Sequence, residues 1–190
     1  NIAVKVLHNR YVYYLLAFVD NYLSHFSFDY LLLKGDEIQR SRVPEFGQLP
    51  LYWLILVIGG MFWAIRRLNG KFNWVWYLLL ITPLASSLTF QSPHAVRSLM
   101  MIVPLTILAA WGAVALIEYL RMKYKISEML TAELLIFVVF FELVRWIFNY
   151  SYLLPYWYPF ATQTGMKEVT EYVEKEKGNY DQIWITDRYD

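Results

Sequence analysis

Three long stretches of the chain contain no charged residue, and they run from Leu49 to Ile65, from Phe72 to Gln91 and from Ser98 to Ile117. Each is about the length needed to cross the hydrocarbon core of a bilayer, roughly 30 Å. None keeps a polar face at helical spacing, as a helix in a soluble bundle would. Because a segment in lipid must satisfy its own backbone hydrogen bonds, the pattern predicts three transmembrane helices.

A fourth stretch, Met129 to Phe148, is equally apolar except for Glu133, Glu142 and Arg145. We predict a fourth span here, so that the expected spans cover about residues 49–65, 72–91, 98–117 and 129–148. Glu142 and Arg145 are three residues apart and share a helix face. Ionisable groups inside a membrane span indicate either a functional site or an internal ion pair, and the sequence leaves both open.

The basic residues of the short loops orient these spans. Lys and Arg concentrate on the cytoplasmic side, and they gather between the first and second spans and between the third and fourth (Arg66, Arg67, Lys71, Arg121, Lys123 and Lys125). Residues 1–48, 89–97 and 149–190 are then extracytoplasmic, in a multi-pass protein of the cell (inner) membrane. The first of these segments also holds Lys34, Arg40 and Arg42, basic residues that require an explanation on the outer face.

Two flanking regions differ from the spans. Residues 1–48 are predicted to form an outer-face helix in the membrane interface, rich in tyrosine around Tyr11 to Val19, followed by a loop. Residues 149–190 begin with an aromatic belt and continue with an amphipathic helix over 164–177 and a short buried strand over 182–186. We expect this region to be the start of an extracytoplasmic α/β domain. The fold class is therefore mainly α and polytopic transmembrane.

Composition narrows the functional classes. The chain of 190 residues is 58% hydrophobic, and its net charge of +1 without a basic tract argues against nucleic acid as a partner. It has no Cys and three His that lie far apart, so no metal site is expected. The chain has no initiator Met and stops just after the predicted strand, so we expect it to be a piece of a larger protein.

The polar break from Thr89 to Arg97 is the first candidate site. His94 and Arg97 are three residues apart, and on a helix beginning near Pro93 both would project from the same side. The Arg guanidinium suits phosphate, and a helix N-terminus adds partial positive charge. Alternatively, Arg97 reaches lipid headgroups and His94 caps the loop.

The second candidate region is the loop that carries Lys34 and Arg40, together with Asp36 and Arg42. These residues could close over the same site, or they could simply be solvated charges. Asp20 and Asp29 are candidate carboxylates on the outer surface, and neither has a partner at a diagnostic spacing. No Gly-rich phosphate loop and no nucleophile elbow is present.

Several stretches resemble bacterial membrane glycosyltransferases of the protein-mannosyltransferase and aminoarabinose-transferase type, and these are residues 9–14, 21–36, 43–52, 83–89, 92–98 and 104–112. The resemblance implies the GT-C fold, with many transmembrane helices and an active site on the outer side. It also implies a polyprenyl-phosphate sugar donor and transfer, with inversion, to a protein, lipid or glycan acceptor.

The resemblance assigns roles to residues as well. It implies that Lys34, Arg40, His94 and Arg97 contact the donor phosphate. The catalytic Asp or Glu of such enzymes, which acts as a base or assists a divalent metal, lies in a first outer loop upstream of this sequence. Two other classes stay open: a transporter or flippase of a lipid-linked or anionic substrate, which would show paired broken helices, and a non-catalytic membrane anchor.

Overall fold

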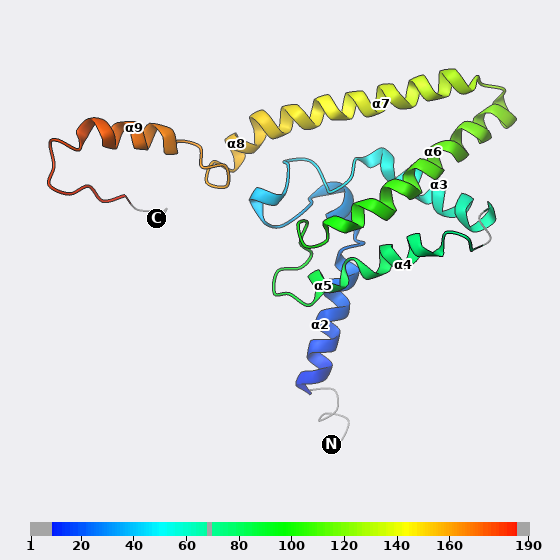
Figure 1. Ribbon diagram of the computed structural model, residues 1–190, viewed down its shortest axis with the longest axis horizontal. Helices are drawn as coiled ribbons and strands as arrows, with labels where there is room; N and C mark the ends of the chain where they lie inside the picture. Colours follow the sequence, from blue (N-terminus) through cyan, green and yellow to red (C-terminus); the bar gives the residue numbers. More distant parts are fainter. Residues whose placement is uncertain (1–8, 68–69, 186–190) are drawn as a thin grey trace.

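The computed structural model describes residues 9–67 and 70–185, which are mainly helical and contain no strand (Figure 1). The longer helices are α2 (Arg10–Ser24), α3 (Leu51–Arg67), α4 (Asn73–Ile81), α6 (Ile102–Tyr124), α7 (Glu128–Phe148) and α9 (Met166–Glu176). The short ones are α5 (Leu84–Ser87), α8 (Leu154–Trp157), the π-helical turns η1 (Asp29–Leu33) and η4 (Asn149–Leu153), and the 3₁₀ turns η2 (Gln39–Ser41) and η3 (Leu99–Met101). The mainly α part of the prediction is confirmed.

Four helices, α3, α4, α6 and α7, run roughly along one direction, and α2 crosses them near one end (Figure 1). We call this end, where α5 and α8 also lie, the α2 end. Helices α3 and α6 run away from it, and α4 and α7 return to it. The two basic loops, around Lys71 and Lys125, therefore share the opposite end, which we call the basic end. The loop charges predict that these two loops lie on the same side of a membrane.

Among the described elements, helices α3 and α6 have the most extensive contact with each other, and glycine residues allow their backbones to approach closely. A Cβ added to Gly60 would lie 1.8 Å from the carbonyl oxygen of Leu108, and one added to Gly112 would lie 1.7 Å from that of Leu56. Around this crossing the side chains of Val57 and Leu105 are buried. Small residues that bring two helix backbones together are typical of helix pairs in membranes.

The predicted span over 72–91 is not one helix, because the chain breaks at Pro83 between α4 and α5. Proline has no N–H, and its ring clashes with the carbonyl four residues earlier, which is that of Leu79. The hydroxyl of Thr82 donates to Leu79 O at 3.3 Å, and the hydroxyl of Tyr22 in α2 donates to Leu80 O at 2.9 Å. Side chains thus satisfy carbonyls that the break leaves free, and α4 alone, at about 14 Å, is too short to cross a bilayer.

One helix in the described ranges, Leu99–Tyr124 with a mean hydropathy of 2.3, is long and apolar enough to cross a membrane. Four were predicted. Helix α3 has 17 residues and α4 has nine. Helix α7 is continuous, but Glu133, Glu142 and Arg145 interrupt its run of apolar residues. A soluble protein can also contain one such helix as its core. The fold by itself therefore shows that the chain is mainly helical, and it does not show how many of its helices cross a membrane.

The C-terminal region follows the prediction only in part. The amphipathic helix expected over 164–177 is present as α9. The strand expected over 182–186 is wrong for residues 182–185, which have no regular secondary structure, and residue 186 lies outside the described residues. The side chain of Trp184 is 89% exposed, and the described part of the chain has no strand with which this segment could pair.

The end of α7 is anchored to the loop between η2 and α3. Arg145 donates to Glu142 Oε2 at 2.9 Å, which is the internal ion pair that the sequence left open, and its guanidinium lies 4.1 Å from the centre of the Phe46 ring. The buried amide of Asn149 donates to Pro44 O at 2.9 Å. These contacts fix the loop against the start of the C-terminal region.

Replacing Asn149 by alanine should reduce the free energy of unfolding by about 1–3 kcal/mol, because it leaves the Pro44 carbonyl buried without its donor. Thermal unfolding of the purified protein in detergent, followed by circular dichroism, measures the loss. Asn179→Ala is the matched control, since Asn179 is exposed and donates to Glu176 Oε2 at 2.9 Å; it should change stability by less than about 0.5 kcal/mol. Equal effects from the two changes would contradict the anchoring role.

Candidate functional site

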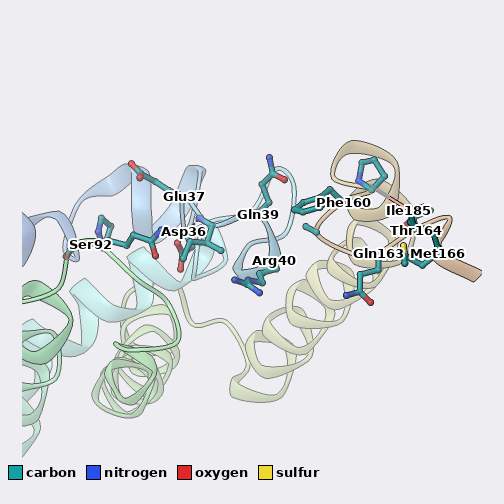
Figure 2. Close-up of a pocket in the computed structure, with 15 residues that line it drawn as sticks. Asp36, Glu37, Gln39, Arg40, Ser92, Phe160, Gln163, Thr164, Met166 and Ile185 are labelled. Carbon is teal, nitrogen blue, oxygen red and sulfur yellow. Dashed lines mark hydrogen bonds between the residues drawn. The ribbon is translucent and has the colours of Figure 1, made fainter. Parts of the chain in front are cut away.

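A cavity of about 910 Å³ lies at the α2 end, where segments distant in sequence meet (Figure 2). One wall is formed by residues 36–40, a second by residues 91–93, and a third by residues between 159 and 166 with Ile185. In Figure 2, Asp36, Glu37 and Ser92 lie on one side, and Phe160, Gln163 and Thr164 on the other. Gln39 and Arg40 stand between the two groups.

Asp36 joins the first two walls. Its carboxylate is 1% exposed and accepts hydrogen bonds from two backbone N–H groups, that of Ile38 at 2.9 Å and that of Ala95 at 2.7 Å. The second bond crosses from one loop to the other. A buried carboxylate is stable only when such donors compensate its charge, so Asp36 fixes the relative position of the two loops.

His94 lies against the same carboxylate. Its Nδ1 is 3.5 Å from Asp36 Oδ2 and 3.3 Å from the backbone nitrogen of Val96. One ring nitrogen cannot accept from the Val96 N–H and donate to Asp36 at the same time, so the two contacts exclude each other. His94 therefore faces Asp36 and does not line the cavity.

Arg97 does not stand at a helix entry. The helix expected to begin near Pro93 is wrong, because residues 95–98 form only turns and regular helix begins with η3 and α6. The N–H and the hydroxyl of Ser98 both donate to His94 O, at 3.1 and 2.8 Å, and close one turn ahead of η3. Arg97 Nη1 instead donates to Thr89 Oγ1 at 2.9 Å and Gln91 O at 3.3 Å.

Of the two remaining predicted phosphate contacts, Lys34 is paired and Arg40 is available. Lys34 Nζ lies 2.6 Å from Asp29 Oδ2, with side chains 71% and 55% exposed, and neither residue lines the cavity. Arg40 does line it, and in the described part of the chain the Arg40 side chain has no hydrogen bond or ion pair. Arg40 is therefore the predicted residue that the fold places in the cavity, while Arg97 bonds to the Gln91 carbonyl of the second wall.

A layer of buried polar groups supports the site. The hydroxyls of Tyr30 and Ser98 lie 3.0 Å apart, and burial raises the pKa of Tyr30 to about 12, so the phenol stays neutral. His25 is buried and donates from Nδ1 to Asn21 O at 2.8 Å. Burial lowers the pKa of His25 below its ordinary 6.5, so protonation of His25 as the pH falls below that value disfavours the folded state.

Sequence reasoning missed most of the cavity lining, including the side chains of Gln39, Gln91, Phe160 and Gln163. It noted Asp36 but not that this carboxylate joins two loops. Among residues 9–67 and 70–185, no group of three or more His, Cys, Asp or Glu could hold a metal ion. The divalent metal that the resemblance allows in a full-length enzyme therefore has no ligand set in this part.

Comparison with protein-family models, curated proteins and solved structures finds no match to the chain.

Proposed function

We propose that this chain is part of an integral membrane glycosyltransferase of the GT-C type. It transfers a sugar from a polyprenyl-phosphate donor to a protein, lipid or glycan acceptor on the extracytoplasmic side of the cell (inner) membrane. The observation that carries the proposal is a cavity lined by both polar and apolar side chains, at one end of a set of helices whose sides are apolar and exposed. The sequence resemblance supplies the reaction class.

The exposed apolar surface supports a membrane location. Along α7 the large apolar side chains are exposed on all sides of the helix, among them Leu134, Ile136, Phe137, Phe140, Phe141, Val144 and Ile147. Only 33% of the apolar stretch of Leu99–Tyr124 is buried, whereas the core helix of a soluble protein is mostly buried. Soluble proteins rarely expose apolar patches larger than a few hundred Å². We therefore place α3, α6, α7 and the broken pair α4 and α5 in lipid, as a multi-pass protein.

Charge and aromatic residues orient the chain in this membrane. Arg66, Arg67, Lys71, Arg121, Lys123 and Lys125 lie at the basic end, which the positive-inside rule places in the cytoplasm. The cavity is then extracytoplasmic. Helix α2 crosses the other helices at the cavity end, and its side chains Tyr11, Tyr13 and Tyr14 are exposed, as in helices that lie in the membrane interface.

This location suits a lipid-phosphate donor. The polyprenyl tail lies in the bilayer beside the apolar helices, and its phosphate reaches the level of the cavity. As the bond between sugar and phosphate breaks, negative charge develops on the phosphate, and a fixed cation stabilises it more in the transition state than in the ground state. Arg40 supplies that cation within the cavity. In the enzymes that the chain resembles, the catalytic carboxylate lies in a first outer loop.

A transporter is less well supported. It would need broken helices at corresponding positions of two repeats. Pro83 does break the second predicted span, but Pro104 lies in the first turn of α6, where proline is tolerated, and α6 continues to Tyr124.

Transfer by the full-length protein in proteoliposomes, supplied with radiolabelled polyprenyl-phosphate sugars, tests the proposal. Arg40→Ala should lower transfer about tenfold or more, since a charge-assisted hydrogen bond to phosphate contributes about 1.5–3 kcal/mol. Arg40→Lys should recover part of it.

Arg121→Ala is the matched control, because Arg121 lies at the basic end and pairs with Glu128; its transfer should equal that of the wild type. Incorporation from none of the donors would refute the glycosyltransferase. Undiminished transfer by Arg40→Ala would remove Arg40 from the donor site.

A further inference from the structure

We propose that the cavity contains a subsite for the uncharged ring of a saccharide, formed by Glu37, Gln39 and Gln163 with Phe160, directly beside the phosphate contact of Arg40. The role of the saccharide, as part of a donor or of an acceptor, rests on the proposed function. Binding itself is measurable without any transfer.

The charged side chains that line the cavity do not suit phosphate in every part of the cavity. The lining carries the carboxylates of Asp36 and Glu37 and the guanidinium of Arg40. Asp36 is buried and its two oxygens are used by backbone N–H groups. Glu37 and Arg40 remain, with opposite signs, so the exposed lining has no excess of positive charge.

Amide side chains supply the groups that a sugar needs. Gln39, Gln91 and Gln163 come from the three different walls. Each amide both donates and accepts hydrogen bonds, and so does each sugar hydroxyl. Within the described residues none of these side-chain amides bonds to another protein group, and neither does the Glu37 carboxylate. All four side chains are therefore available to a ligand.

An apolar surface lies across the cavity from Glu37 and Gln39. Phe160 projects from its segment toward the loop that carries Gln39, and Met166 and Ile185 lie on the same side of the cavity (Figure 2). A sugar ring has C–H groups on its faces, and these pack on an aromatic ring, whose face is electron-rich. The cavity volume of about 910 Å³ lies within the range of small-molecule sites, about 300–1,000 Å³.

Saturation-transfer NMR on the full-length protein in detergent micelles tests the subsite, with methyl glycosides of common hexoses and pentoses as probes. At least one glycoside should receive saturation. Gln163→Ala and Gln39→Ala, on two different walls, should each weaken its binding about threefold to tenfold, as expected for the loss of one or two hydrogen bonds. Glu37→Gln should also weaken it, whereas Glu171→Gln on α9, outside the lining, should leave it unchanged.

A second probe separates the ring from the phosphate. Arg40→Ala should weaken binding of the corresponding sugar 1-phosphate by about tenfold or more, and binding of the methyl glycoside by a smaller factor. The inference is overturned if no glycoside receives saturation, if the Gln39 and Gln163 variants bind like the wild type, or if inorganic phosphate displaces the glycoside. Transfer without glycoside binding would overturn this subsite alone; glycoside binding without transfer would overturn the glycosyltransferase and leave the subsite.

Discussion

Gly112→Ala should destabilise the protein by about 3 kcal/mol, even though alanine is the better helix former. The added Cβ would lie 1.7 Å from Leu56 O and 2.6 Å from its carbonyl carbon, and both of these are backbone atoms that no side-chain rotation can move. The two helices must therefore separate. Separation weakens the packing of Val57, Leu105 and Leu108, which are buried between them. Gly60→Ala should have a similar effect, since its Cβ would meet Leu108 O at 1.8 Å.

Gly59→Ala provides the control for this prediction. Gly59 lies on the same helix, but its added Cβ would be 3.8 Å from Gly112 Cα, an ordinary contact. The gain in helix propensity, up to about 1 kcal/mol, should then leave the variant as stable as the wild type or more so. Thermal unfolding in detergent compares the three variants. If Gly112→Ala and Gly59→Ala unfold at the same temperature, the close crossing of α3 and α6 is not present.

Asp36→Ala should have the second large effect, a loss of about 3 kcal/mol or more, because each charge-assisted hydrogen bond contributes about 1.5–3 kcal/mol. The change removes the acceptor of the Ile38 and Ala95 N–H groups at once. It also releases the loop that carries Gln91 from the loop that carries Gln39. Hydrogen exchange of the backbone amides should therefore accelerate in residues 36–40 and 91–98 before it does in α3 or α6.

The matched change is Asp29→Ala. Asp29 is a carboxylate of the same region, but it is exposed and paired only with Lys34, and such pairs contribute about 0–1 kcal/mol. Its exchange pattern should resemble that of the wild type. Normal protection of the Ala95 amide in Asp36→Ala would show that the carboxylate does not join the two loops.

The positions of the long helices could be predicted from the sequence because a long uncharged run leaves the chain few alternatives. Helices α3 and α7 begin and end within two residues of the predicted runs 49–65 and 129–148. The errors lie where the helices are broken or start late. Pro83 interrupts the second run, and residues 95–98 form only turns where a helix was expected to begin. Both effects depend on backbone contacts that hydrophobicity alone does not reveal.

The candidate site was less predictable. The polar break from Thr89 to Arg97 does lie beside the cavity, and its residues Gln91 to Pro93 form one wall. The other walls come from residues 36–40 and 159–166, which are more than a hundred residues apart in the sequence. No local spacing connects them. Gln39 and Gln163 have no signature of their own, so they become candidates only when the fold brings them together.

The alternating course of α3, α4, α6 and α7 has an electrostatic consequence. Helices α3 and α6 begin at the α2 end, near the cavity, with Leu51 and Ile102 as their first residues. Peptide dipoles add along each helix to roughly half a positive elementary charge at its N-terminus. Helices α4 and α7 end at the same end of the molecule and contribute roughly half a negative elementary charge each, so the four dipoles largely offset one another and the ionised side chains set the potential of that end.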